Sequence, residues 1–178
     1  TLSKGVVKLT AQMGPTGESD GSDVDLLLKK GSSWKSAATA AIDKMARTAT
    51  FKLDEWDATK DIPYKLVYKM MVPGDKLQEF EWEGTIRKDP VDKEELVVAG
   101  FTGNNDLGFP NADLVKNIKH HEPDMLFFSG DQIYEGVGGY GAQRSPIDKS
   151  TLDYLRKWYL YGWAYRDLLK DRPSVAIP

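Results

Sequence analysis

The strongest constraint on the fold is a change in hydrophobic pattern near residue 90. Before it, every second side chain is apolar in residues 6–13 (VVKLTAQM) and 64–70 (YKLVYKM). Such alternation, with one polar face, is typical of antiparallel strands that cover one core. After it, residues 96–101 (LVVAGF) and 125–129 (MLFFS) are apolar or small throughout, which predicts parallel strands buried on both faces. Two different folds are therefore expected in one chain.

The first ninety residues are predicted to form an all-β sandwich domain of the immunoglobulin or fibronectin kind. Residues 79–86 alternate as well, with Phe80, Trp82 and Ile86 on the expected core side. Residues 32–46 (SSWKSAATAAIDKMA) leave two alternatives, because their alanines favour a helix whereas a strand followed by a turn fits equally. The charged segment RKDPVDKEE (87–95) is the predicted connector to the second domain.

Residues 91–178 are predicted to follow a β-α-β-α-β order, which indicates a parallel sheet with right-handed crossovers. The first helix is expected in residues 111–121, with Asn111 as its N-cap and Asp113 in its first turn. The second helix is expected in the aromatic residues 150–171, before a last short strand in SVAIP (174–178).

Composition excludes several classes of protein and site. The net charge is −3, so no overall basic field attracts nucleic acid. The chain has no cysteine, which excludes disulfides and thiolate metal sites. No apolar run approaches the roughly 20 residues that a membrane-spanning helix requires, so no transmembrane segment is expected. Because the first residue is Thr1 rather than Met, we expect a processed N-terminus from which a signal peptide was removed.

The segment GDQIYE (130–135) carries the clearest chemical signal. Asp131 stands where the second parallel strand is expected to end, and ligands of open parallel sheets gather beyond the carboxyl ends of the strands. Tyr134 lies three residues on, close enough to turn back toward Asp131. A carboxylate and a phenolate are hard oxygen ligands that suit a divalent or trivalent metal. The competing interpretation is a simple turn beside a packing tyrosine.

Residues 130–135, preceded by an apolar strand, resemble the Gly-Asp-x-x-Tyr motif of calcineurin-like metallophosphoesterases. More narrowly, they resemble the alkaline phosphatase D (PhoD-like) family, as do WEGTIRKDP (82–90) and YRDLLKDRPSVAIP (165–178). The resemblance implies that the sandwich is followed by the first β-α-β-α-β part of an α/β metallophosphoesterase sandwich. It also implies a hydrolase that cleaves phosphate esters, as a phosphatase or phosphodiesterase, through two metal ions drawn from iron, calcium, zinc or manganese.

The resemblance assigns metal ligands to residues of this chain. Asp131 would bridge the two ions, and Tyr134 would bind the ferric-type ion. A further ligand, Cys or Asp in the family, follows the first parallel strand, where this chain has Thr102. Thr is a poor metal ligand, so Asn104, Asn105 or Asp106 from the same loop are alternative donors.

Other conspicuous residues have weaker assignments. Residues 135–144 (EGVGGYGAQR) are expected to form a wall or lid of the site. From it Arg144 would face a phosphate, or it would simply be an exposed arginine. His120 and His121 are expected at a helix C-terminus, at the edge of the sheet away from the site.

The family's later ligands have no counterpart before Pro178. The expectation is therefore an N-terminal part of a longer enzyme, with the rest of its catalytic domain C-terminal to Pro178. The isolated chain is expected to be inactive and to bind metal weakly, and the family's usual export predicts a periplasmic or secreted protein. The alternative function is a non-catalytic β-sandwich adhesion or scaffold protein with a degenerate phosphatase-like domain, which Thr102 in place of Cys or Asp favours.

Overall fold

The computed structural model describes residues 1–103 and 108–177, which form ten strands in three sheets and two α-helices. The chain divides into two compact units, Thr1–Asp89 and Pro90–Pro178. The strands of the first unit are β1 Leu2–Ser3, β2 Val6–Gln12, β3 Asp23–Lys30, β4 Ser33–Ala41, β5 Thr48–Leu53, β6 Ile62–Val72 and β7 Lys76–Ile86.

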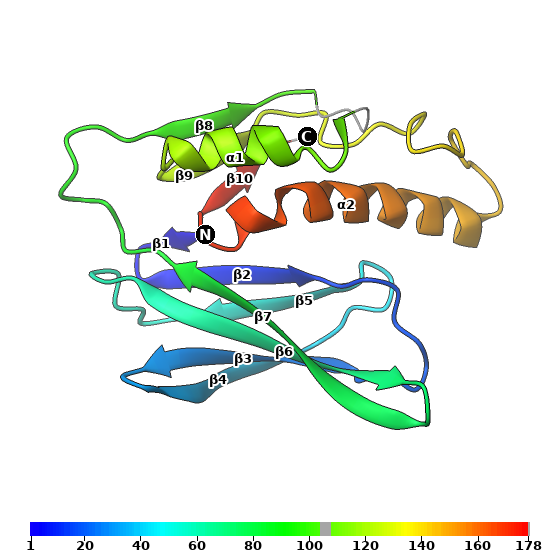
Figure 1. The fold of residues 1–178 in the computed structure, drawn as a ribbon, viewed down its shortest axis with the longest axis horizontal. Helices are drawn as coiled ribbons and strands as arrows, with labels where there is room; N and C mark the ends of the chain where they lie inside the picture. Colours follow the sequence, from blue (N-terminus) through cyan, green and yellow to red (C-terminus); the bar gives the residue numbers. More distant parts are fainter. Residues whose placement is uncertain (104–107, 178) are drawn as a thin grey trace. The chain divides into compact units, whose positions relative to one another are not determined.

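The first unit is a β-sandwich of two antiparallel sheets (Figure 1). One sheet has the order β1-β2-β5 and the other has the order β4-β3-β6-β7. The core lies between them, because alternate side chains of β2 and β5 pack against alternate side chains of β3 and β6. Its buried members are Val7, Ala11, Val24, Leu26, Leu28, Ala49, Phe51, Tyr64 and Ile86. The predicted core face of residues 6–13 is confirmed, since Leu9 and Met13 also pack against this cluster.

The ambiguous segment 32–46 is resolved as strand β4 followed by a turn, so its helical alternative is wrong. Pairing of β4 with β3 supplies the ladder hydrogen bonds that a short alanine-rich segment cannot gain alone.

The prediction that Phe80 and Trp82 face the core is wrong, because their side chains are 40% and 41% exposed. Strands β6 and β7 have 11 residues each, whereas β2 has 7 and β5 has 6. The long hairpin has no opposing strand of equal length to cover it, and Ile86 is the β7 residue buried in the core. Alternation therefore identified the strand but not how much of it is covered.

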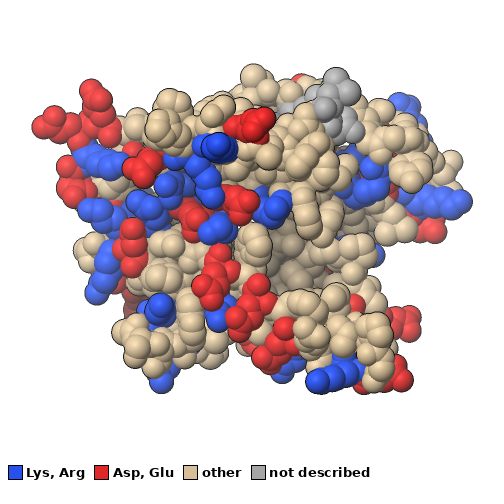
Figure 2. All heavy atoms as spheres, in the orientation of Figure 1, with Lys and Arg blue, Asp and Glu red and all other residues tan. Residues whose placement is uncertain are grey.

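Charged side chains of opposite sign pair across this hairpin. Lys65 Nζ lies 2.6 Å from Glu81 Oε2 and 3.2 Å from Glu83 Oε1, and Lys69 pairs with Glu79 at 3.7 Å. Acidic and basic side chains are likewise intermixed over much of the surface that Figure 2 shows. Because these glutamates are exposed, the pairs contribute little to the stability of the fold.

The second unit has the order β8 Val98–Phe101, α1 Ala112–His120, β9 Met125–Phe128, α2 Ile147–Leu169 and β10 Ser174–Ala176. Its sheet has the order β10-β9-β8, and both pairs are parallel. The predicted parallel pairing of residues 96–101 with 125–129 is thereby confirmed. Both crossovers step in the same direction across the sheet, so right-handed connections place both helices on one face.

The core of the second unit lies between that face and the two helices. Phe101 and Phe128 are register partners and stack with ring centroids 4.5 Å apart. The buried members are Phe101, Val115, Leu126, Phe128, Ala164, Tyr165 and Leu168. On the opposite face Val98 and Val175 are 48% and 39% exposed. The prediction that residues 96–101 are buried on both faces is therefore wrong, because both helices cover the same side.

Two features of the helices differ from expectation. Asn111 precedes α1 as predicted, but it adopts the left-handed conformation (φ 57°) and its side chain makes no capping hydrogen bond. Its backbone N–H instead donates to Gly108 O at 2.6 Å. Helix α2 begins at Ile147, three residues before the predicted start. In the described residues, neither helix combines the length and apolar character needed to cross a membrane.

Candidate functional site at the carboxyl edge of the parallel sheet

The loops after β8 and β9 begin side by side at the carboxyl edge of the sheet. Ser129, the first residue after β9, donates from both its backbone N–H and its hydroxyl to Phe101 O, each at 2.9 Å. The residues after Phe101 and those after Phe128 therefore leave the sheet together. This edge is where parallel sheets collect ligands.

Asp131 and Tyr134 meet at this edge. The Tyr134 hydroxyl donates to Asp131 Oδ2 at 3.1 Å. Gly130 (φ 113°) and Asp131 (φ 51°) both have positive φ, and this tight turn leaves the Asp131 side chain exposed. Desolvation, followed by the hydrogen bond to Asp131 and its negative charge, raises the pKa of the Tyr134 phenol. The phenol is therefore a hydrogen-bond donor to the carboxylate at neutral pH.

Gly103, in the loop after β8, closes against this pair. It has φ 62°, and a Cβ built on it would lie 3.2 Å from the Tyr134 hydroxyl oxygen. A side chain there would crowd the phenol, and the positive φ already disfavours non-glycine residues. The glycine thus permits the close approach of the first loop to the second.

Gln132 anchors the start of the Asp131–Tyr134 turn. Its side chain is 8% exposed, and its Nε2 donates to Ile177 O at 2.8 Å and to Phe128 O at 3.3 Å. One buried amide thus joins the ends of β9 and β10 beneath Asp131. This satisfied polar group fixes the turn against the sheet.

Helix α2 anchors the other end of the turn through a charged cluster of the buried Lys157 with the partly buried Asp153 and Arg156. Lys157 is 4% exposed, and its Nζ donates to Asp153 Oδ2 at 2.5 Å and to the backbone oxygens of Glu135 and Gly141. Arg156 donates to Asp153 Oδ1 at 3.0 Å and to Gly138 O at 2.7 Å. The hydrogen bond from Lys157 lowers the pKa of Asp153, and that from Arg156 adds to the effect. The Gly-rich segment 135–143 is therefore held on α2.

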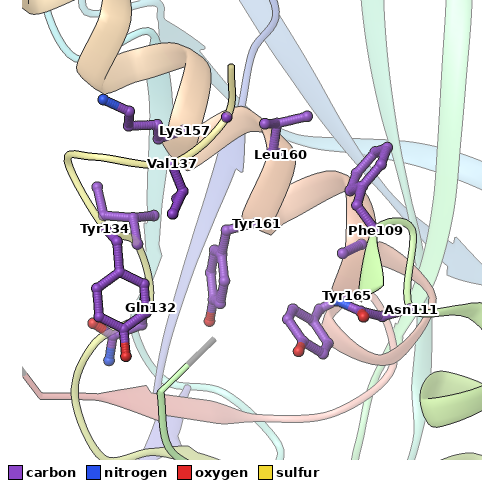
Figure 3. Close-up of a pocket in the computed structure, with 12 residues that line it drawn as sticks. Phe109, Asn111, Gln132, Tyr134, Val137, Lys157, Leu160, Tyr161 and Tyr165 are labelled. Atoms are coloured by element: carbon purple, nitrogen blue, oxygen red, sulfur yellow. The ribbon is translucent and has the colours of Figure 1, made fainter. Parts of the chain in front are cut away.

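A small pocket lies beside the pair. Tyr134, Gln132, Tyr161 and Tyr165 line it together with residues of α2 and the loop before α1, and Figure 3 shows the three tyrosine hydroxyls pointing the same way. Its volume of about 40 Å³ accommodates a few water molecules. Burial raises the pKa of Tyr161, so this phenol remains neutral.

The structure brings together some of the predicted site residues. Asp131 and Tyr134 are in contact, and Thr102 is exposed at the same edge, next to Gly103. Arg144 is exposed in the segment before α2. The candidate donors Asn104, Asn105 and Asp106 lie outside the described residues. Within residues 1–103 and 108–177, no group of three or more His, Asp or Glu side chains is placed to hold a metal.

Sequence reasoning missed Gln132 and Lys157. Gln132 sits inside the motif but acts through backbone carbonyls that are distant in sequence, so its role leaves no local signal. For Lys157 a signal exists, because Asp153, Arg156 and Lys157 are spaced i, i+3 and i+4 within an aromatic-rich helix. Such spacing places an acid and two bases on one helix face.

The amino edge of the same sheet holds a different carboxylate. Asp124 accepts hydrogen bonds from Lys93 Nζ at 2.5 Å and from the Val97 backbone N–H at 3.0 Å. The hydrogen bond from Lys93 lowers the pKa of Asp124. His120 and His121 lie at the end of α1, with ring centroids 5.8 Å apart and both side chains exposed.

Comparisons of the chain with protein-family models, with curated proteins and with solved structures give no match.

Proposed function

We propose that this chain is the N-terminal part of a metal-dependent phosphoric ester hydrolase resembling alkaline phosphatase D, in which Asp131 and Tyr134 bind metal. The observation that carries the proposal is the contact between the Tyr134 hydroxyl and Asp131 Oδ2. It places two hard oxygen donors at the carboxyl end of the central strand of a parallel sheet, the position and the donor type that such a centre requires.

The donor pair fits a metal centre in its orientation and exposure. Asp131 is exposed and, within the described residues, accepts a hydrogen bond from Tyr134 alone, so a second carboxylate oxygen is available for coordination. If the phenol lost its proton, the Tyr134 phenolate and the Asp131 carboxylate would be two adjacent anionic ligands. Two metals in such a centre would polarise the phosphate and supply hydroxide. The chain itself would hold two of the metal ligands, Asp131 and Tyr134, at a fixed position relative to each other.

The proposed metal centre needs ligands besides Asp131 and Tyr134. A two-metal centre needs several nitrogen or oxygen donors for each ion, so the proposal includes a longer protein that supplies them. The asparagines and aspartate at 104–106 and the hydroxyl of Thr102 are the proposed donors from this chain. Arg144 is the proposed phosphate contact.

The topology supports the finer fold assignment within this proposal. The order β1-β2-β5 opposite β4-β3-β6-β7 is compatible with an immunoglobulin-like or fibronectin-like sandwich, in which the third, sixth and seventh strands share a sheet. The β-α-β-α-β order of the second unit is compatible with the opening half of a metallophosphoesterase domain.

The test is hydrolysis of a chromogenic phosphomonoester and a chromogenic phosphodiester by the full-length protein, with chelator and with added manganese or iron. We expect turnover that depends on metal and falls at least about tenfold in Tyr134→Phe, the lower range for perturbing a metal's surroundings. Absence of turnover with every metal would favour the alternative, a non-catalytic sandwich protein with a degenerate phosphatase-like domain.

A further inference from the structure

Lys157 is a buried cation whose hydrogen-bonding capacity is already used within the protein. An ammonium group has three N–H donors, and Lys157 Nζ has three acceptors, Asp153 Oδ2, Glu135 O and Gly141 O. Figure 3 shows its amino group directed away from the rings of Tyr134 and Tyr161. Although Lys157 lines the pocket, its charge is therefore not available to bind an anion there.

The burial of this ion pair calls for a reason other than stability. The side chains of Lys157 and Asp153 are 3% and 9% exposed, and a buried pair often stabilises a fold no better than apolar residues of similar volume. What an apolar side chain cannot do is bind two carbonyl groups of a loop. Two of the three hydrogen bonds from Lys157 go to such carbonyls in segment 135–143.

We propose that Lys157 is a positioning residue, which fixes segment 135–143 to α2 and thereby holds Tyr134 against Asp131. The bonded carbonyl of Glu135 directly follows Tyr134 in the chain, while Gln132 fastens the other end of the turn to β9 and β10. The two metal ligands of the proposed function thus lie between two buried polar anchors. The expected effect of Lys157 on turnover rests on the proposed function, whereas its structural role does not.

Arg156 supports the same attachment one residue earlier in α2. It donates to Gly138 O, and its guanidinium carbon lies 5.0 Å from the centroid of the Tyr140 ring. A Cβ built on Gly138 would come within 2.7 Å of Arg156 Nη1, and Gly138 has φ 87°. The glycine therefore allows the loop to approach the helix closely enough for both bases to reach its carbonyls.

The test compares Lys157→Met with Lys149→Met, an exposed lysine on the same helix. NMR would follow the nuclear Overhauser effect between the Gly103 α-protons and the Tyr134 ring, and the exchange of the Val137 and Gln143 amides, which donate to Tyr134 O and Asp153 Oδ2. In Lys157→Met we expect loss of the Overhauser effect and exchange on the order of tenfold faster at these amides, with α2 amides unchanged. In Lys149→Met we expect no change.

Turnover separates this inference from the proposed function. In the full-length protein, Lys157→Met should lower kcat for the phosphodiester while Lys149→Met retains it. If the parent protein shows no metal-dependent turnover, the proposed function fails, and the NMR comparison still decides the positioning role. An unchanged Overhauser effect in Lys157→Met overturns the inference. If that variant does not fold, Lys157→Gln removes the charge but keeps a polar side chain of similar length, and it should also speed the exchange of the Val137 and Gln143 amides. Unchanged exchange in Lys157→Gln likewise overturns the inference.

Discussion

The two edges of the parallel sheet each carry an aspartate, and the two differ in how much of their hydrogen-bonding capacity is used. At the amino edge, both oxygens of Asp124 accept hydrogen bonds, one from Lys93 and one from the Val97 N–H. At the carboxyl edge, Asp131 accepts one from Tyr134, within the described residues. The side chain of Asp124 is 13% exposed, whereas Asp131 is open to solvent.

This difference separates a structural carboxylate from one available for binding. Asp124 joins the connector before β8 to the start of β9, so its hydrogen bonds hold two chain segments together. Among residues 1–103 and 108–177, the Asp131 side chain bonds no segment distant in sequence, and its positive φ is a conformation that non-glycine residues adopt infrequently. Within the described residues, an exposed carboxylate with one hydrogen bond is open to a ligand in a way that Asp124 is not.

The largest expected effect is the loss of stability in Asp124→Asn compared with Asp131→Asn. Asp124→Asn removes the charge that Lys93 pairs with and one of two acceptors, so we expect a cost of about 1–3 kcal/mol in the free energy of unfolding. Asp131→Asn should change it by less than about 0.5 kcal/mol, because asparagine tolerates positive φ. Urea denaturation of both variants measures the difference, and equal costs would remove the distinction between the edges.

Acid sensitivity should follow the same division. The pKa of Asp124 is lowered from its ordinary value of 3.8 by its hydrogen bond from Lys93. A carboxyl with a depressed folded-state pKa contributes stability that is present above its unfolded-state pKa and is lost as pH falls through its folded-state pKa. Urea midpoints measured from pH 5 to pH 2 should therefore fall less steeply in Asp124→Asn than in the parent protein. An identical slope would show that Asp124 does not contribute.

Gly103→Ala tests the close approach of the loop after β8 to Tyr134, and Gly31→Ala is its matched control. The two glycines have φ 62° and 61°, but a Cβ on Gly31 would meet nothing within 4 Å, whereas one on Gly103 would meet the Tyr134 hydroxyl. Both variants should lose roughly 1 kcal/mol to backbone strain. Only Gly103→Ala should shift the Tyr134 ring resonances. Equal shifts in both variants would mean that the contact with Tyr134 does not form.

The smallest effect is expected from replacing both His120 and His121 with alanine. Both are exposed at the end of α1, toward the edge of the sheet where β9 begins. Metal-dependent turnover of the full-length protein should stay within about twofold of the parent value, since no ligand of the proposed centre is changed. A loss of activity beyond tenfold would contradict our placement of the metal at the carboxyl edge of the sheet.

Sequence patterns predicted the fold where local rules decide it. Strict alternation identified the antiparallel strands, and its absence identified the parallel pair β8 and β9, although β8 proved to be buried on one face. The exposure of Phe80 and Trp82 could not be predicted, since it depends on the unequal lengths of strands distant in sequence. For the same reason, no pattern showed that both helices cover one face of the sheet and leave Val98 exposed.

The candidate site was predictable only in part. Asp131 and Tyr134 are near each other in the chain, and Gly130 indicates the turn that brings them together. Their anchors use backbone carbonyls as acceptors, and every residue carries a carbonyl, so the sequence does not show which one Gln132 or Lys157 will bind. Asn111 illustrates the reverse case, in which the residue type favoured a cap but the backbone conformation removed it.

The central claim is that Asp131, and not Asp124, is a metal ligand. The most direct test is the metal content of the purified full-length protein after equilibration with manganese or iron, measured by mass spectrometry for the parent, Asp131→Asn and Asp124→Asn. We predict about two metal ions in the parent and in folded Asp124→Asn, as a dinuclear centre requires, and loss of at least one ion in Asp131→Asn. Full metal content in Asp131→Asn would contradict the account.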